Sequence, residues 1–364
     1  MPPAISHPSS KSTLMQASPP RANQKLHSKP IMKPARLDQH AIVAALKGQT
    51  LRVPDLTAFL RAWPPAVLHP RHAEVAPVVI ALIERIAVSH PPLARRKGDD
   101  IAGLISLCYP QAAEGGLETL VMFGVWLVCW DDTVDAGEGD LAGDFDGADR
   151  WRSQTLEMIR GALGIDGTDA EKHPDTINAA FQTVGECLSG TTPIDQRRRL
   201  YEELWYFITS CAVEQQLRLE QRIPDYDSYM GFRLGTIGGS TLCALVEFAN
   251  REPLPSAVVA APQVRELWTQ VSTMLTFIND LLSLKKELGT DCVINAVTSL
   301  LSPEKGLDEV VGELEHKLRQ AVDDFDRVAG ELFVLVDGDE EQSGVVTRYI
   351  NGCRSIVTGT LEFT

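Results

Sequence analysis

Residues 277–287 of the chain read FINDLLSLKKE, a polar stripe inside an apolar segment. Asn279, Ser283 and Glu287 recur at every fourth position, so on an α-helix they lie along one face over about 12 Å. An amide, a hydroxyl and a carboxylate offer hard oxygen ligands of the kind that Mg²⁺ prefers. A solvated helix face would show the same spacing, but apolar residues such as Ile278 flank this stripe. The segment is therefore predicted to be a buried helix that carries a magnesium site.

The composition limits the kinds of protein to which this helix could belong. The chain has 364 residues and is 44% hydrophobic, enough for one large core or two modest ones. It carries 34 basic and 49 acidic side chains, a net charge of −15, and the first 36 residues contain no acidic side chain. Such an acidic body argues against nucleic acid or an anionic membrane as a partner. It suits a protein that binds divalent cations.

The N-terminal segment and the cysteines indicate where in the cell the protein would be found. Residues 1–36 are rich in Pro, Ser and Lys, so we expect a disordered tail, followed by one domain over residues 37–364. No segment has the roughly 18 to 20 uninterrupted apolar residues that would span a membrane. The seven cysteines are scattered and form no paired motif, which predicts reduced core residues in a cytoplasmic protein.

Helical periodicity runs through the chain from residue 75 onward, and no alternating strand pattern competes with it. The helices are expected at residues 75–89, 93–108, 117–134, 150–163, 176–188, 195–221, 226–249, 264–288, 291–301, 306–335 and 343–364. The sequence therefore predicts an all-α fold, a single helical domain without internal repeats.

A second acidic cluster ends the apolar segment 117–134, where residues 130–135 read WDDTVD. Asp131 and Asp135 lie one helical turn apart, and like charges at that spacing repel unless a cation neutralises them. This cost favours a functional cluster in which a bound cation neutralises the two carboxylates. A helix that merely enters an acidic loop is the other interpretation, because five more acidic residues follow within residues 138–149.

Together the two clusters resemble the class I terpene synthases, whose D-D-x-x-D/E and N-D-x-x-S-x-x-x-E motifs hold three Mg²⁺ ions and a prenyl diphosphate. Asn279-Asp280-x-x-Ser283-x-x-Lys286-Glu287 is most similar to the fungal sesquiterpene cyclases, including the trichodiene-synthase-like group. The resemblance covers roughly residues 75–364. It implies a single-domain class I terpenoid synthase helical bundle.

A third match begins at residue 224 with the pattern P-D-Y-x-x-Y-x-x-x-R-x-x-T-x-G. Its arginine, Arg233, lies 46 residues before Asn279 and resembles the family's diphosphate-binding arginine. The planar guanidinium suits this role because it can bind phosphate oxygens in pairs. Without the resemblance, a lone arginine would more often be a surface or ion-paired residue.

The C-terminal segment departs from the family's pattern. Relatives carry a late Arg-Tyr pair whose arginine binds diphosphate, and Arg348-Tyr349 looks similar to it. However, the pattern Y-x-x-G-C-R at residues 349–354, followed by G-x-x-x-F at residues 359–363, resembles the helix that precedes this pair. The pair would then lie beyond Thr364. We therefore expect a chain that is truncated before the pair, in preference to one in which Arg348 substitutes for its arginine. The missing segment would weaken diphosphate capture.

The resemblance implies a lyase of sesquiterpene biosynthesis that ionises an acyclic prenyl diphosphate, which we expect to be farnesyl diphosphate. It would cyclise the cation to a sesquiterpene or a sesquiterpene alcohol. Arg233 and Lys286 are expected to bind the leaving diphosphate and stabilise its growing charge. An apolar pocket would keep water from the carbocation, and aromatic faces would stabilise it. The candidate wall residues, which core packing would also explain, are Phe123, Leu127, Phe207, Ile237, Trp268 and Leu275.

Two other functions compete with this interpretation. A chain-elongating prenyltransferase uses similar helices and metals, but normally has a second aspartate-rich motif where this chain has residues 279–287. A non-catalytic diphosphate-binding relative would fit a chain without the late Arg-Tyr pair. In each case we expect a monomer or homodimer that binds a small-molecule diphosphate.

Overall fold

Helices account for the regular structure of the protein, as the periodicity predicts. The computed structural model describes residues 39–134, 139–165, 173–289 and 293–364. Within these ranges no residue belongs to a β-strand, and Ser302 and Lys305 form an isolated β-bridge. The all-α prediction is confirmed. The predicted tail and Asp135 lie outside the described residues.

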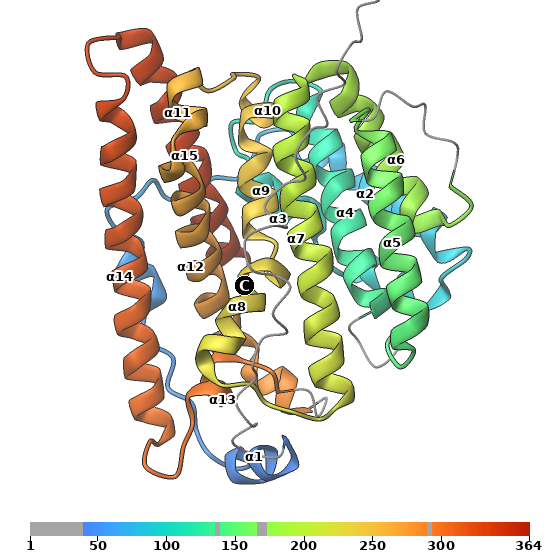
Figure 1. The fold of residues 1–364 in the computed structure, drawn as a ribbon, viewed down its shortest axis with the longest axis vertical. Helices are drawn as coiled ribbons and strands as arrows, with labels where there is room; N and C mark the ends of the chain where they lie inside the picture. Colours follow the sequence, from blue (N-terminus) through green and yellow to red (C-terminus); the bar gives the residue numbers. More distant parts are fainter. Residues whose placement is uncertain (1–38, 135–138, 166–172, 290–292) are drawn as a thin grey trace, which may run out of the picture. The chain divides into compact units, whose positions relative to one another are not determined.

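The described chain forms helices of very different lengths (Figure 1). The first half contains α1 (Gln39–Leu46), η1 (Leu56–Leu60), α2 (His72–Ala87), η2 (Pro91–Gly98), α3 (Ile101–Cys108), α4 (Gly116–Val134), α5 (Phe145–Ala162), α6 (Thr176–Thr191) and α7 (Ile194–Leu219). The second half contains α8 (Tyr226–Thr236), α9 (Gly239–Ala244), α10 (Val246–Asn250), α11 (Ser256–Ala260), α12 (Pro262–Gly289), α13 (Ala296–Leu300), α14 (Leu307–Val334) and α15 (Glu340–Phe363).

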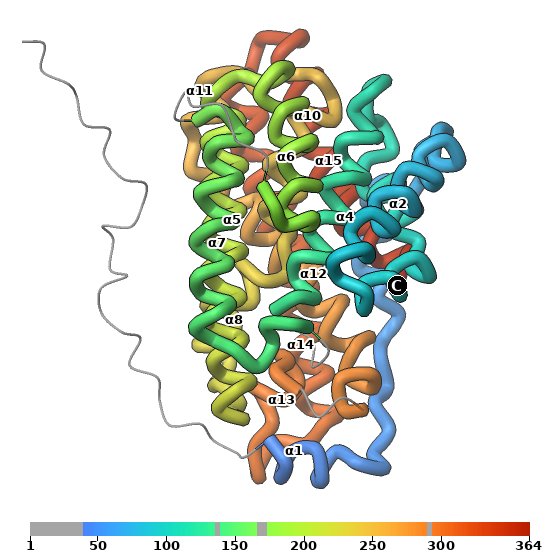
Figure 2. The backbone as a smooth tube through the Cα atoms, turned by 90° about the vertical axis from the view of Figure 1, so that its right-hand side faces the viewer, coloured from blue at the N-terminus to red at the C-terminus, as the bar shows by residue number. Residues whose placement is uncertain are grey.

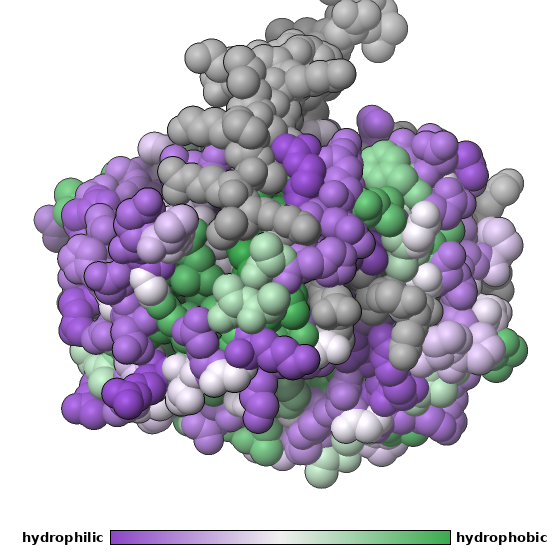
Figure 3. Space-filling model, turned by 90° about the horizontal axis from the view of Figure 1, so that it is seen from below, coloured by the Kyte–Doolittle hydropathy of each residue, from purple (hydrophilic) through white to green (hydrophobic). Residues whose placement is uncertain are grey.

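The long helices lie side by side as a bundle (Figures 1 and 2). α12 packs against α14 and α15, α7 packs against α5 and α8, and α4 packs against α2 and α6. The short helices α8 and α9 contact both α7 and α12, so they lie between these two long helices. The C-terminal ends of α7 and α12 point toward the end of the bundle that carries α13. Figure 3 shows this end, where polar side chains surround a group of apolar ones.

α4 is apolar around most of its circumference and is therefore a core helix. Its two tryptophans, Trp126 and Trp130, are fully buried. The Trp130 ring stacks on Trp151 of α5 at 5.1 Å and lies 5.5 Å from Phe207 of α7. The Trp130 Nε1 donates a hydrogen bond of 3.1 Å to Thr155 Oγ1, so the polar tip of the ring is satisfied inside the core. This packing fixes the C-terminal half of α4, where the acidic cluster begins.

The prediction of one helix over residues 226–249 is wrong, because the chain breaks into α8, α9 and α10. Gly238 between α8 and α9 has φ +71°, a left-handed conformation that glycine adopts without a steric cost. Gly239 is needed for a different reason, because a Cβ there would lie 2.8 Å from Ser272 Oγ and 3.0 Å from Leu275 Cδ1. Two adjacent glycines thus allow a helix break in close contact with α12.

Two other boundaries differ from the predicted ones because aspartates cap helices. The predicted helix 93–108 consists of η2 and α3, and Asp100 caps α3 by accepting a bond of 2.8 Å from Gly103 N. α5 begins at Phe145 instead of residue 150, because Asp144 accepts a bond of 2.9 Å from Gly147 N. The acidic loop after α4 is therefore shorter than the composition indicated.

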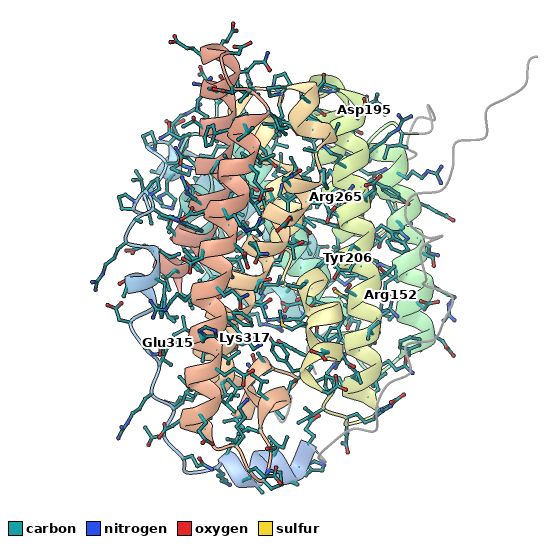
Figure 4. All side chains as sticks on the ribbon, turned by 60° about the vertical axis from the view of Figure 1, so that its left-hand side comes forward. Arg152, Asp195, Tyr206, Arg265, Glu315 and Lys317 are labelled. Carbon is teal, nitrogen blue, oxygen red and sulfur yellow. The ribbon has the colours of Figure 1, made fainter. Side chains whose placement is uncertain are left out.

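Polar contacts tie the long helices to one another, and Figure 4 labels several of the residues involved. Arg265 of α12 pairs with Glu202 and Glu203 of α7. The Tyr206 hydroxyl of α7 donates a bond of 3.2 Å to the Gly231 carbonyl of α8. Lys317 of α14 lies 4.6 Å from the ring centre of Tyr226, at the start of α8. These links tie α12 to α7, and α8 to both α7 and α14.

Candidate functional site

The last turns of α4 carry two adjacent aspartates with different surroundings. Asp131 is half-buried and lines a small pocket with Arg233 and Cys211, whose Sγ lies 3.8 Å from Asp131 Oδ1. Asp132 faces another side of the helix, since consecutive residues are about 100° apart. Its carboxylate accepts bonds of 2.6 and 2.5 Å from Arg96, and Arg95 adds a third of 3.1 Å. Asp131 is thus placed to bind a ligand, whereas Asp132 is used inside the protein.

The C-terminal end of α4 is also held from α7. Arg218 Nη2 donates a bond of 2.6 Å to the Val134 carbonyl and one of 3.1 Å to the Ala142 carbonyl. A cation beside the last carbonyls of a helix stabilises its C-terminal end. The neighbouring Gln215 donates 2.8 Å to the Leu141 carbonyl. The described segments on both sides of residues 135–138 are therefore anchored to the same helix.

The predicted oxygen stripe is present on α12. Asn279, Ser283 and Glu287 are all half-buried and lie one turn apart. Both Glu287 oxygens accept internal hydrogen bonds, since the Ser283 hydroxyl donates to Oε1 and Asn295 Nδ2 donates 3.0 Å to Oε2. Burial raises the pKa of Glu287, and these two hydrogen bonds oppose the rise.

Arg233 of α8 joins the two acidic arrays. It lines the pocket that contains Asp131, and its Nη2 donates 2.7 Å to Asn279 Oδ1 and 3.1 Å to Asp280 Oδ1. Its side chain is 14% exposed. Burial opposes the charge, but Tyr229 and Asp280 outweigh it and the pKa of Arg233 lies well above its ordinary value. A buried guanidinium that remains charged is therefore placed between the two predicted sets of metal ligands.

Asp280 is a buried partner of Arg233 that the sequence interpretation did not single out. It is 1% exposed, accepts 2.5 Å from the Tyr229 hydroxyl and 2.8 Å from Ala296 N, and forms the ion pair with Arg233. The signal was present, because Asp280 and Tyr229 both stand inside the quoted motifs. Spacing does not indicate that the first backbone N–H of α13 donates to this aspartate. Asp280 therefore holds the Arg233 guanidinium in place and anchors the start of α13.

Three of the predicted wall residues converge on the break between α8 and α9. Ile237 directly precedes Gly238, and a Cβ built at Gly238 would lie 3.5 Å from Leu127 Cδ2. Leu275 contacts the neighbouring Gly239. Leu127 and Leu275 thus lie beside the two glycines of the helix break, a few residues along the chain from Arg233. Their role as a substrate wall stays a prediction.

The other predicted residues have surroundings of a different kind. Phe123 and Phe207 pack into the tryptophan cluster of α4, and Trp268 Nε1 donates 2.6 Å to the Tyr349 hydroxyl near the other end of α12. Lys286 is exposed beside Glu287 on the last turns of α12. Arg348 is also exposed and pairs with Glu252, in the loop after α10, so it does not join Arg233.

The donor set fits divalent cations bound together with an anion. Among the described residues, no three His, Cys, Asp or Glu side chains converge into a preformed cage. Asp131 instead lines one pocket with the cationic Arg233, and Arg233 donates to Asn279 Oδ1, the first oxygen of the stripe on α12. Mg²⁺ commonly takes one or two carboxylates and completes its shell with water and substrate phosphates. Within the described residues, no helix is long and apolar enough to cross a membrane.

This bundle and its paired oxygen arrays define a class I terpene synthase, and the comparison with known families agrees. Residues 122–324, more than half of the chain, match "Terpene synthase family 2, C-terminal metal binding". The chain belongs to this family and is a terpene synthase, a lyase. The matched span includes the end of α4, all of α8 and the stripe on α12.

The relatives include several fungal cyclases. The chain is 29% identical over 326 residues to "Sesquiterpene cyclase hepA" of Aspergillus oryzae, which covers 86% of this chain and 87% of the relative. It is 27% identical over 278 residues to "(1R,4R,5S)-(-)-guaia-6,10(14)-diene synthase" of Fusarium mangiferae, covering 72% and 68%. The predicted resemblance to fungal sesquiterpene cyclases is confirmed.

Solved structures support the fold. Linalool/nerolidol synthase from Streptomyces clavuligerus superposes with a TM-score of 0.70 at 19% identity, covering 82% of this chain and 98% of that protein. Germacradien-4-ol synthase from Streptomyces citricolor gives 0.67 at 18% identity, covering 87% and 98%. At such identities the similarity concerns the fold alone.

Proposed function

We propose that the enzyme binds farnesyl diphosphate with three Mg²⁺ ions and cyclises it to a sesquiterpene or a sesquiterpene alcohol, releasing diphosphate. The observation that carries this proposal is the position of Arg233, a charged donor between Asp131 and Asn279. Two oxygen arrays with a guanidinium between them complement an anion that is wrapped in divalent cations. The similarity to relatives named as sesquiterpene cyclases supports a fifteen-carbon substrate.

In this proposal Asp131, with Asp135 in a secondary role, would hold metal on the α4 side. Asn279, Ser283 and Glu287 would hold it on the α12 side. When bound, the ions supply positive charge that neutralises the diphosphate and makes it a better leaving group. Arg233 and Lys286 would donate to the phosphate oxygens.

The reaction begins when the bond between the allylic carbon and the diphosphate oxygen breaks. The electron pair leaves with the diphosphate, and Arg233 stabilises the charge that develops there. A distant double bond of the same chain then attacks the allylic cation and closes the ring. The final cation loses a proton to give a hydrocarbon, or adds water and releases a proton to give an alcohol. Leu127, Ile237 and Leu275 would exclude other water from these steps.

We also propose a cellular compartment and an oligomeric state for the enzyme. We place the enzyme in the cytoplasm, as a monomer or homodimer. None of the six described cysteines forms a disulfide, and five of them are buried, which favours a reducing compartment.

Product analysis tests the proposal directly. The full chain is incubated with Mg²⁺ and ten-, fifteen- or twenty-carbon prenyl diphosphates, and volatile products are analysed by gas chromatography and mass spectrometry. We expect cyclic products from the fifteen-carbon substrate and no longer chains when isopentenyl diphosphate is added. Asp131→Ala and Glu287→Ala should each lower diphosphate release at least 100-fold, whereas Asp227→Asn, an exposed control on α8, should not. Normal turnover in both site variants would refute the metal assignment.

A further inference from the structure

Arg233 forms a hydrogen bond with an oxygen atom that the proposed metal site needs as a ligand. Its Nη2 donates 2.7 Å to Asn279 Oδ1, the only oxygen through which that side chain can bind a metal. The donors to Glu287, another predicted ligand, are of a different kind. The Ser283 hydroxyl and the Asn295 amide that donate to Glu287 are both neutral. Arg233 differs from them because it carries a charge.

A cation at Asn279 would therefore meet a second cation. Mg²⁺ binds oxygen ligands at about 2.0 to 2.1 Å. A metal and a guanidinium nitrogen that share Asn279 Oδ1 would thus be about 4 Å apart, a distance at which like charges repel strongly in a partly buried site. Metal binding at Asn279 requires either that Arg233 moves away or that an anion comes between the two.

Asp280 gives Arg233 a fixed support for such a movement. One Asp280 oxygen accepts from Tyr229 and from the Ala296 backbone, so the carboxylate is held in place, and its other oxygen pairs with Arg233. Nη2 makes both the bond to Asn279 and this ion pair, so a rotation of the guanidinium about the ion pair would break the first contact and keep the second. Arg233 also has donors to spare, since Nε is buried without an acceptor among the described residues and Nη1 makes only a long contact of 3.4 Å to Thr236 Oγ1.

We infer that the Arg233–Asn279 contact is a latch that keeps the α12 metal site weak until diphosphate arrives. The anion attracts the spare donors of Arg233, the guanidinium leaves Asn279 Oδ1, and the released oxygen binds metal. Metal and diphosphate thereby strengthen each other's binding, as linkage requires. This inference rests on the proposed function, because it assumes that Asn279 and Glu287 hold metal.

Manganese binding tests the latch without measuring turnover. Mn²⁺ substitutes for Mg²⁺, and the free ion is quantified by electron paramagnetic resonance, with and without inorganic diphosphate. In the absence of diphosphate, Arg233→Met should bind Mn²⁺ at least tenfold more tightly than the wild type. Adding diphosphate should tighten Mn²⁺ binding in the wild type far more than in the variant. A residue that only maintains the structure would weaken binding in both conditions.

Other variants keep the result decisive. Arg233→Lys retains a charge for Asp280 and should bind Mn²⁺ more tightly than the wild type, so it decides the matter if Arg233→Met does not fold. Arg198→Met, an exposed control on α7, should change Mn²⁺ affinity less than twofold. Arg233 variants that bind Mn²⁺ no more tightly than the wild type would overturn the latch.

Asn279→Ala and Glu287→Ala separate the two proposals. If these variants bind Mn²⁺ as the wild type does, the α12 metal site fails and the latch fails with it. If they weaken Mn²⁺ binding while the Arg233 variants do not strengthen it, the latch alone is refuted and the proposed function stands.

Discussion

Replacing Asp131 and Asp132 one at a time should separate a ligand-binding role from a structural one at adjacent positions. Asp132 is 7% exposed and receives three hydrogen bonds from Arg95 and Arg96. Removing one partner of a buried ion pair costs about 3 to 5 kcal/mol. The cost should be smaller here, because Arg96 is 24% exposed and keeps Asp99 as a partner. We expect Asp132→Asn to lower the free energy of unfolding by about 2 to 3 kcal/mol.

Asp131→Asn should have the opposite profile. Asp131 is half-buried beside the pocket, so its replacement should change the unfolding free energy by less than about 1 kcal/mol. It should nevertheless weaken Mn²⁺ binding in the presence of diphosphate at least tenfold. Urea unfolding followed by circular dichroism gives the first quantity, and paramagnetic resonance of free Mn²⁺ gives the second.

A double-mutant cycle identifies the partner of Asp132. Combining Asp132→Asn with Arg96→Gln should give a coupling energy of about 1 to 3 kcal/mol. A stability loss under about 0.5 kcal/mol for Asp132→Asn would refute the structural role assigned to this residue. Equal losses of stability from Asp131→Asn and Asp132→Asn, with metal binding unchanged in both, would refute the division of roles altogether.

Three further predictions concern the elements around the site. Gly238→Ala should lower the free energy of unfolding by about 1 to 2 kcal/mol, because alanine is strained at the φ of +71°. The nearest atom to the new Cβ lies 3.5 Å away, so the backbone strain alone should account for the loss. A loss above about 4 kcal/mol in urea unfolding would mean that packing is affected too. The hydrogen bond that His90 Nε2 donates to Asp175 Oδ2 raises the pKa of His90. The stability from this pair is therefore complete below the ordinary histidine pKa of about 6.5 and is lost as pH rises through the raised value. Melting temperatures of wild type and His90→Gln should converge as pH rises, and a constant difference would contradict this. Arg218→Met removes the donor to the Val134 carbonyl and should lower the free energy of unfolding by about 1 to 2 kcal/mol, measured in urea. Arg218→Lys should recover part of the loss. An unchanged unfolding midpoint in Arg218→Met would show that this hydrogen bond does not stabilise the protein.

The sequence predicted the fold class and most long helices because their apolar periodicity is regular. The stripe on α12 was predictable for the same reason, since one helix sets the relative positions of Asn279, Ser283 and Glu287. Boundaries set by capping were missed, as the early start of α5 at Asp144 illustrates. Capping depends on one side chain, which a window of hydrophobicity does not register.

Relations between helices were less accessible to sequence analysis. The break at Gly238 looked like an uninterrupted helix, because nothing in local periodicity indicates that Gly239 must touch Ser272 of α12. The division between Asp131 and Asp132 depends on Arg96, which lies in η2 and outside every quoted motif. The contact between Arg233 and Asn279 joins residues 46 positions apart in sequence. Resemblance to a family indicated that both residues matter, but only their positions in space show that Arg233 donates to the Asn279 oxygen.

The tryptophan cluster of α4 gives this enzyme an intrinsic optical reporter at its site. Trp130 precedes Asp131 directly and stacks on Trp151 at an interplanar angle of 11°, and Trp126 lies 6.4 Å away. Half of the six tryptophans therefore absorb and emit within one small volume beside the pocket. Excitation of stacked indoles is shared between the rings, so near-ultraviolet dichroism registers their mutual angle. Quenching of their emission by Mn²⁺ would register an ion at Asp131, with no label attached to the protein.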